Sequence, residues 1–437
     1  MTRRSTLRTL ALTGASAVAL LSGIATAHAG AFGLREQGAM AQGSSFAGVA
    51  SGSGGLSSMY WNPATITMNP GFQTYTSVSL LNLDAKITPY AGPTSVFGPS
   101  GQLGELAAIP SSQVSYQIND RVWVGMTTNA PLGLVTKPNN AWAGQVYGRT
   151  SKVFSLNLNP IIGIKVTDWL SVAAGPAIEY VDIKLRRATG VLPNAPSATL
   201  RGDDVDFGWT VGATITPLAG TSIGIGYRSS ISHDLKGRID SPTIPLPGNR
   251  ALIQSKFNTP DILTIGLTQA ITPDFRVNLG YEFANWSRVG TLGQVAYGSA
   301  LAGAVINKLP LNYRDGHFVS VGAEYDLSQQ WTVRGGLAYE WSPVTDAVRS
   351  VGVPDANRIW ASLGASYRYS DKISVDLAYT HVFAKKGPIG INPGDPYYEG
   401  LPFNAMAKGS IDIASIGLKY RRDDVRVARP AAVVARY

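Results

Sequence analysis

The 437-residue chain contains no cysteine, and this absence excludes both a disulfide framework and a cysteine-based metal site. Charged residues are scarce as well: they make up 15% of the sequence, whereas an ordinary soluble domain carries about 25%. Hydrophobic residues account for 44% of the chain. So little charge in a long chain is unusual for a soluble domain.

Long apolar runs are missing beyond the first residues. Arginines at positions 3, 4 and 8 precede an apolar run from Leu10 to Ile24, which ends in small residues at Ala27-His28-Ala29. This order is typical of a secretory signal peptide, which we expect to cover residues 1–29. No later stretch reaches the roughly 20 apolar residues that a membrane-spanning helix needs. We therefore expect an exported protein without a transmembrane helix.

Histidine is rare, and the usual catalytic motifs are absent. His233, His317 and His381 are the histidines that follow the signal peptide, and none of them lies in a GxSxG or HExxH motif. An outer-membrane lipase or protease would be the enzymatic alternative. We expect no enzyme activity, no metal site and no cofactor.

The sequence is rich in glycine, aromatic residues and two-residue alternation, with 48 Gly, 19 Tyr and 9 Trp. From Trp331 to Ser342 one face carries large apolar side chains, while Arg334 and Glu340 lie on the other face. Period-2 alternation indicates a strand, here with Arg334 and Glu340 directed into a lumen. The same division recurs from Ile359 to Tyr369. An exported all-β chain of this kind favours an outer-membrane barrel over the alternatives, a secreted β-sandwich or β-helix.

Short polar links alternate with long links that are rich in glycine and proline. The short links are at 118–121, 167–168, 217–220, 272–274, 328–330 and 370–372. The long links are near 88–104, 131–149, 188–201, 239–252, 289–313, 343–356 and 386–404. This alternation predicts a 14-stranded antiparallel transmembrane β-barrel with short periplasmic turns and long outer loops.

The chain is accordingly divided into four parts. Residues 1–29 form the signal peptide, and residues 30–71, which are rich in Gly, Ser and Ala, form an N-terminal hatch (plug) inside the barrel. Residues 72–421 form the barrel and residues 422–437 a periplasmic tail. A barrel wider than eight strands leaves room for such a plug.

The net charge of +9 does not indicate a nucleic-acid partner. The basic residues are scattered along the chain and form no cluster interleaved with aromatic residues. Basic side chains near the outer surface of a barrel contact lipid phosphates, so outer-membrane lipid and lipopolysaccharide (LPS) are the expected macromolecular surroundings.

Several motifs follow one another along the chain. They are Gly30 to Phe32, Asn62-Pro63-Ala64, Asn129 to Thr136, Asn157 to Val166, Asn285 to Val289, Ala338 to Val344 and Pro354 to Tyr369. Together they resemble the motifs of the FadL/TodX family of outer-membrane transporters for long-chain fatty acids and other hydrophobic compounds.

The resemblance implies that Asn62, Pro63 and Ala64 make a hatch contact. Pro63 fixes its own φ and favours an extended Asn62, while the Asn62 side chain is free to bond nearby backbone groups. We therefore expect the motif to hold the plug against the barrel wall. An ordinary loop turn is the alternative.

The resemblance also implies passive transport. A hydrophobic ligand enters an apolar pocket, the hatch rearranges, and the ligand leaves through a gap beside a kinked third strand. Here that strand is expected from Arg121 to about Val135, and Asn129, Pro131 and Gly133 form the candidate gate, because proline removes a ladder donor. The alternative is that Pro131 ends the strand at the outer rim.

Five residues are expected near the ligand. Phe32 matches the hatch phenylalanine that the family inserts into its pocket, and Arg187 and Lys308 match basic residues that meet a carboxylate. The alternative for these two cations is a solvated rim charge or an LPS contact. Arg334 and Glu340 join the candidate ligand contacts as lumen-facing residues, although alternation leaves open whether they touch ligand, hatch or each other.

Substrate class stays open between long-chain fatty acids and aromatic or alkane hydrocarbons, and a general porin is a further alternative. An apolar face on the fifth strand, running toward Arg187, favours an acyl chain that carries a carboxylate. The third and fourth outer loops, near 188–201 and 239–252, are shorter than those of the fatty-acid members, which implies a different capture site. We expect a monomer.

Overall fold

The computed structural model describes residues 30–91, 98–299 and 301–422 of the chain. The expected signal peptide, residues 1–29, and residues 423–437 of the expected tail lie outside the described residues. Arg422, which was assigned to the tail, is the last residue of a wall strand.

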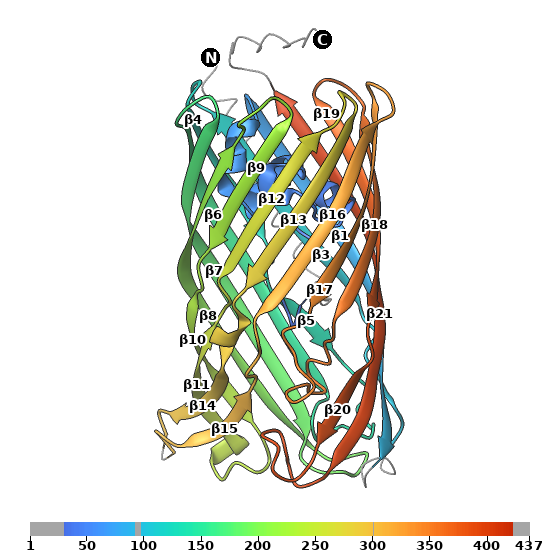
Figure 1. Ribbon diagram of the computed structural model, residues 1–437. Coiled ribbons are helices and arrows are strands. Elements are labelled where there is room, and N and C mark those ends of the chain that lie inside the picture. Colours follow the sequence, from blue (N-terminus) through green and yellow to red (C-terminus); the bar gives the residue numbers. More distant parts are fainter. Residues whose placement is uncertain (1–29, 92–97, 300, 423–437) are drawn as a thin grey trace.

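The described chain forms a closed antiparallel barrel of 14 wall strands, as predicted (Figure 1). Several wall strands are interrupted, so that the hydrogen-bonded segments outnumber them. The segments are β1 (Phe72–Ala91), β2 (Gly101–Gln102), β3 (Leu106–Gln117), β4 (Val122–Asn129), β5 (Gly133–Thr136), β6 (Thr150–Lys165), β7 (Leu170–Ala188), β8 (Ser197–Ile215), β9 (Thr221–Arg228), β10 (Ser232–Asp240), β11 (Arg250–Asn258), β12 (Ile262–Ala270), β13 (Phe275–Ala284), β14 (Thr291–Tyr297), β15 (Val305–Pro310), β16 (Gly316–Asp326), β17 (Trp331–Trp341), β18 (Arg358–Arg368), β19 (Ile373–Ala384), β20 (Gly387–Ile391) and β21 (Phe403–Arg422).

The first and last strands close the barrel. Their register runs without a break from Phe72 opposite Arg422 to Pro89 opposite Ala405. All neighbouring wall strands are antiparallel, and each of the six predicted short links joins two of them at the same end of the barrel. The long links gather at the other end, where Figure 1 shows β14, β15 and β20. Short turns face the periplasm in bacterial barrels, so the β14–β15 end is extracellular.

The alternation predicted for β17 is observed. Trp331, Leu337 and Trp341 are 44%, 57% and 39% exposed, whereas Arg334 and Glu340 are buried in the lumen. The exposed apolar face is the one that contacts lipid. No helix within residues 30–91, 98–299 and 301–422 is long and apolar enough to cross a membrane.

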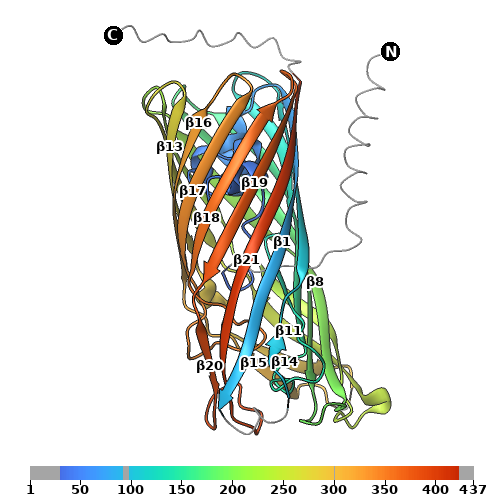
Figure 2. The ribbon, with the colours of Figure 1, turned by 90° about the vertical axis from the view of Figure 1, so that its right-hand side faces the viewer.

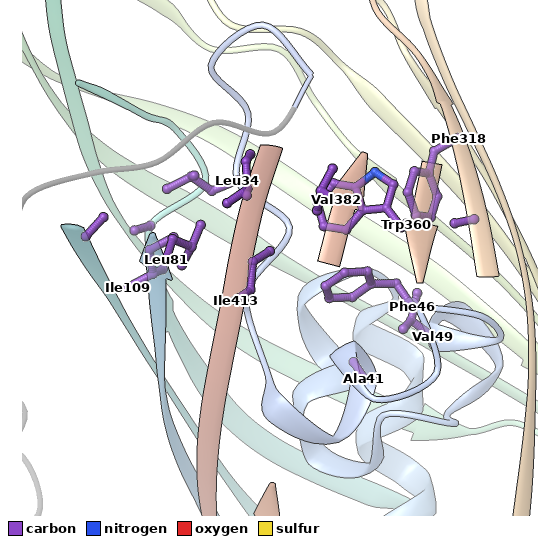
Figure 3. Close-up of a cluster of buried hydrophobic side chains, with 14 of the residues drawn as sticks. Leu34, Ala41, Phe46, Val49, Leu81, Ile109, Phe318, Trp360, Val382 and Ile413 are labelled. Atoms are coloured by element: carbon purple, nitrogen blue, oxygen red, sulfur yellow. The ribbon is translucent and has the colours of Figure 1, made fainter. Parts of the chain in front are cut away.

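Residues 30–71, here called the N-terminal segment, lie inside the barrel in the half that carries the short turns (Figures 1 and 2). The segment contains α2 (Ala39–Gln42) and the 3-10 turns η1 (Val49–Ser51), η2 (Gly55–Tyr60) and η3 (Pro63–Met68). Phe46 packs edge-on against Trp360 and Phe318 of the wall, with ring centroids 6.0 and 6.4 Å apart (Figure 3). The segment is therefore a packed plug, although it contains little regular secondary structure.

Inward-facing glycines allow the plug backbone to touch the wall. A Cβ atom at Gly224 would lie 1.7 Å from the carbonyl oxygen of Ala50, and one at Gly226 would lie 1.9 Å from that of Trp61. Any larger residue at these wall positions would displace backbone atoms of the plug. The high glycine content of the sequence thus has a specific use on the lumen side of the wall.

Candidate functional site

An apolar cavity of about 180 Å³ lies in the barrel between the N-terminal segment and the extracellular loops. Its apolar lining comes mainly from the strands between β5 and β15 and includes Leu134, Val153, Ile183, Leu185, Leu235, Ile253, Phe257, Leu292, Leu309 and Leu311. These residues alternate with outward-facing residues along their strands, so the lumen side of each strand supplies every second side chain. Apolar cavities of this kind are suited to apolar ligands.

Phe32 of the N-terminal segment lines this cavity. Its ring is 3% exposed and stands edge-on to Trp286, with centroids 4.8 Å apart. Phe257 and Tyr313 complete an aromatic cluster around it, at 5.9 and 6.4 Å. Trp286 and Tyr313 lie in links outside regular strands, so sequence alternation did not identify them.

The third wall strand is broken at Pro131. β4 ends at Asn129 and β5 resumes at Gly133, so proline interrupts the strand rather than ending it at the rim. On the other side, β3 pairs with β4 only as far as Ser112 opposite Thr128. Residues 106–111 of β3 have no partner on that side among the described strands. The wall ladder is therefore incomplete between β3 and β5.

The N-terminal segment occupies the break. The backbone N–H of Leu34 donates to the carbonyl of Pro131 at 2.8 Å, and the N–H of Gly133 donates to the carbonyl of Phe32 at 2.8 Å. Gly33 and Leu132 form an isolated antiparallel bridge between these two bonds. The residue whose ring lines the cavity thus also pairs, through its backbone, with the break in the wall.

Gln37 joins the two edges of this gap. Its side chain donates to the carbonyl of Ala130 at 2.9 Å and accepts from the Asn129 amide at 3.0 Å. Its backbone carbonyl accepts from the Ser111 hydroxyl on β3 at 2.9 Å. Sequence reasoning placed Asn129 in the gate but missed Gln37, because no local pattern indicates a contact across about 90 positions.

Arg35 fixes the same stretch to the opposite wall. Its guanidinium lies 2.8 Å from Glu282 on β13 and 3.5 Å from Glu340 on β17, and stands 3.8 Å over the Phe318 ring. Glu340 also accepts from the Trp360 indole at 3.1 Å. Buried charges need such partners, because desolvation penalises an unpaired charge. Glu340 therefore contacts the N-terminal segment and not the large cavity.

A smaller cavity, lined by both charged and apolar residues, lies beside this ion cluster. Its lining includes Pro131 and Leu132 of the break together with Arg35, Glu282, Glu340, Glu179 and Arg228. It thus joins the strand break to the residues that hold the N-terminal segment. Sequence reasoning did not identify Glu179 or Arg228, whose roles depend on neighbours from distant strands.

Asn62 caps η3, which begins with Pro63 and Ala64, and attaches it to the wall. Asn62 is extended (φ −142°, ψ 105°) and its side-chain oxygen accepts from the Ala64 N–H at 3.0 Å. Its amide donates to the carbonyls of Ala50 at 2.7 Å and Ala213 at 2.9 Å. Because Ala213 belongs to β8, the Asn62 side chain links the N-terminal segment to the wall.

The remaining predicted cations occupy different environments. Arg187 lines the large cavity and forms an ion pair with Glu399. Lys308 borders the cavity, but its side chain is exposed. It pairs with Gly293, whereas the adjacent pair, Leu292 and Leu309, lies on the opposite face of the strands, where Leu292 is buried. Arg334 lies away from the cavity, beside Gly43 of the plug, and its guanidinium is 3.3 Å from Glu324. Within the described residues, no cluster of three or more His, Asp or Glu side chains is suited to hold a metal.

Comparison with known proteins gives a consistent result. Residues 18–421 match the model of a family described as outer membrane protein transport protein (OMPP1/FadL/TodX). The chain is 28% identical to a 47 kDa outer membrane protein of Pasteurella multocida, over 93% of this chain and 97% of that protein. It is 25% identical to a long-chain fatty acid transport protein of Escherichia coli, over 85% and 90% of the two chains.

Solved structures share the fold. The crystal structure of a Pseudomonas aeruginosa FadL homologue aligns with a TM-score of 0.80 at 22% identity and covers 89% of this chain and 99% of that one. The toluene transporter TbuX of Ralstonia pickettii aligns with a TM-score of 0.64 at 19% identity, over 90% and 99% of the two chains. With its signature motifs, its 14-stranded wall and a family match over most of its length, this chain belongs to the OMPP1/FadL/TodX family of outer-membrane proteins of Gram-negative bacteria.

Proposed function

We propose that the protein is a passive, monomeric channel that carries hydrophobic molecules across the outer membrane and releases them through the break in the third wall strand. One observation carries this proposal: the Phe32 ring lines the apolar cavity, while the Phe32 backbone pairs with Gly133 beside the break. A ligand that enters the cavity competes with the ring for the same space. Displacing the ring pulls on the hydrogen bonds that occupy the break.

Opening then continues along the N-terminal segment. Once residues 32–34 leave the break, Gln37 still joins its two edges, and the ion pairs of Arg35 still hold the segment to β13 and β17. The smaller cavity beside Pro131 offers a route from the large cavity to the gap. A hydrophobic ligand that passes this route enters the lipid directly and avoids crossing the rest of the plug.

Long-chain fatty acids are the favoured substrates. The apolar lining that includes Ile183 and Leu185 leads to Arg187, which is paired with Glu399 at the cavity wall. A ligand carboxylate would replace the Glu399 carboxylate on the same guanidinium. Aromatic or alkane hydrocarbons are the alternative, because the rest of the lining offers them the same apolar surface. The packed plug argues against a general porin, and the transport proteins among the relatives argue against an enzyme.

A reversible lock on the break tests the mechanism. The chain has no cysteine, so Gly33→Cys with Leu132→Cys introduces a single possible disulfide across an antiparallel bridge. In cells that lack their own transporter, oxidation should abolish uptake of oleate and of toluene, and reduction should restore it. A Cβ atom at Gly33 would lie 3.2 Å from Trp286, so the substitution itself can shift that ring. For this reason the oxidised variant is compared with the same variant after reduction.

The single variants Gly33→Cys and Leu132→Cys control for the substitutions themselves and should be insensitive to oxidant. Unchanged uptake in the oxidised double variant, with the disulfide verified by mass spectrometry, would exclude release at this break. Uptake of toluene without uptake of oleate in the wild type would assign the hydrocarbon alternative.

A further inference from the structure

A row of four cations crosses the outer face of the barrel. Lys152 on β6 lies directly opposite Lys184 on β7, Lys184 lies opposite Arg201 on β8, and Arg201 lies opposite Arg238 on β10. Residues paired in this way point to the same face of the sheet. Val153 and Ile183, the neighbours of Lys152 and Lys184, are buried on the lumen side, so the row points outward.

This arrangement is unfavourable for the protein alone. Like charges directly opposite each other destabilise a sheet, and Cβ atoms at such positions are only about 4.5–5.5 Å apart. Lys152 and Arg201 both repel the ammonium group of Lys184, as does Arg186. Within the described residues, no carboxylate lies within ion-pair distance of Lys152, Lys184 or Arg201, whereas Arg238 is 3.2 Å from Asp240.

Nearby carboxylates compensate for only part of this charge. Asp182 and Asp203 face each other in the adjacent row on the membrane side, and Asp203 is opposite Lys236. These two aspartates therefore repel each other, and Lys236 adds a further positive charge beside them. The four-cation row thus retains an excess of positive charge.

The row is located just above the lipid-facing belt. On β6 it is two residues beyond Phe154, whose ring lies 6.5 Å from that of Tyr180. On β8 it is four residues beyond Val205, and Val205, Phe207 and Trp209 are all more than half exposed. At about 3.3 Å per residue, the cations stand roughly 7–13 Å along the strands from this belt. We therefore expect the row to meet the headgroup layer, and the long-loop end identifies the outer leaflet.

We propose that the row formed by Lys152, Lys184, Arg201 and Arg238 is a binding site for the phosphate groups of lipid A, the LPS lipid of the outer leaflet. Phosphate oxygens accept charge-assisted hydrogen bonds from ammonium and guanidinium groups. The acyl chains lie against the exposed apolar residues below the row. One lipid A molecule thus contacts the four cations through its phosphates and the lipid-facing belt through its acyl chains. The site goes beyond transport and does not depend on which substrate the channel carries.

The variant Lys152→Gln/Lys184→Gln/Arg201→Gln tests the site in purified, delipidated protein. Its matched control is Arg121→Gln/Lys165→Gln/Lys372→Gln, which removes three positive charges at the short-turn end. Binding of bis-phosphorylated lipid A, followed by native mass spectrometry, should weaken at least about tenfold in the first variant and less than about twofold in the control. Dephosphorylated lipid A should bind both proteins equally weakly.

Thermal stability provides a second readout, because the substitutions that weaken lipid A binding should not destabilise the lipid-free protein. Without lipid, the row variant should be at least as stable as the wild type, because substitution removes repulsion between opposed cations. Added lipid A should raise the melting temperature of the wild type and of the control more than that of the row variant. Equal lipid A affinity in all three proteins would overturn the proposal. So would inorganic phosphate that binds the wild type as tightly as lipid A, since that would indicate a site for free anions.

Discussion

The side chains of Gln37 and Asn129 are hydrogen-bonded to each other at 3.0 Å, across the position where the third wall strand breaks. Gln37 belongs to the N-terminal segment and Asn129 is the last residue of β4. Because the Gln37 carbonyl also accepts from Ser111 on β3, this one residue spans both edges of an incomplete ladder.

The first prediction follows from this bond. Gln37→Ala should increase leakage of small hydrophobic dyes through reconstituted protein several-fold, because the two edges of the gap lose their shared partner. Gln42→Ala is the matched control: Gln42 is also fully buried, but it donates to the carbonyl of Ile413 on β21, which is not an edge of the gap. Each variant should lose about 1–3 kcal/mol of stability. Equal leakage in the two would assign Gln37 a packing role only.

The second prediction concerns pH. Burial raises the pKa of Glu36 in the N-terminal segment to about 7, opposed by Arg35 and reinforced by Glu340. Its Oε1 is buried without a hydrogen-bond partner among the described residues, and Arg358 is a further charge that acts on it. If the displaced segment exposes Glu36, the carboxyl regains its ordinary pKa, 4.5.

The closed state then binds more protons than the open state between pH 4.5 and about 7. Protonation of Glu36 stabilises the closed state fully below this window. This contribution to the free energy of closure is lost as the pH rises through the window, by up to about 3 kcal/mol. Leakage of the wild type should therefore rise from pH 5 to pH 7.5. Glu36→Gln should stay at the low-pH level throughout, and a pH dependence unchanged in that variant would refute the assignment.

The third prediction tests the contact between plug and wall. Gly224→Ala places a Cβ atom against the Ala50 carbonyl, so it should displace η1, increase leakage and destabilise the protein by about 1–3 kcal/mol or more. Gly293→Ala is the control for the same change, because no heavy atom lies within 4 Å of the position that its Cβ atom would take. Limited proteolysis of residues 30–71 should separate the two variants.

The fourth prediction distinguishes the two cations at the cavity. Arg187→Ala should reduce oleate uptake about tenfold or more and leave toluene uptake unchanged, because only oleate carries a carboxylate. Lys308→Ala, whose side chain is exposed on the other face of β15, should change neither. A loss of oleate uptake in Lys308→Ala alone would reverse this assignment.

Sequence periodicity predicted the wall well, because the alternation of apolar and polar residues directly records which face meets lipid. The resemblance to the family pointed to the third strand, and Pro131 marked a position within it, since proline removes a ladder donor. Gln37, Arg35 and Trp286 were missed for a physical reason: their partners are distant in the chain, and nothing local distinguishes them. Arg334 and Glu340 were correctly directed into the lumen, but only the packed plug reveals that they contact it.

The inward-facing glycines bear on how the protein is assembled. The space between Gly224 and the Ala50 carbonyl is too small even for a methyl group, so the plug and the wall are in direct contact there. We therefore expect the plug to take its place no later than the pairing of β1 with β21, which closes the wall.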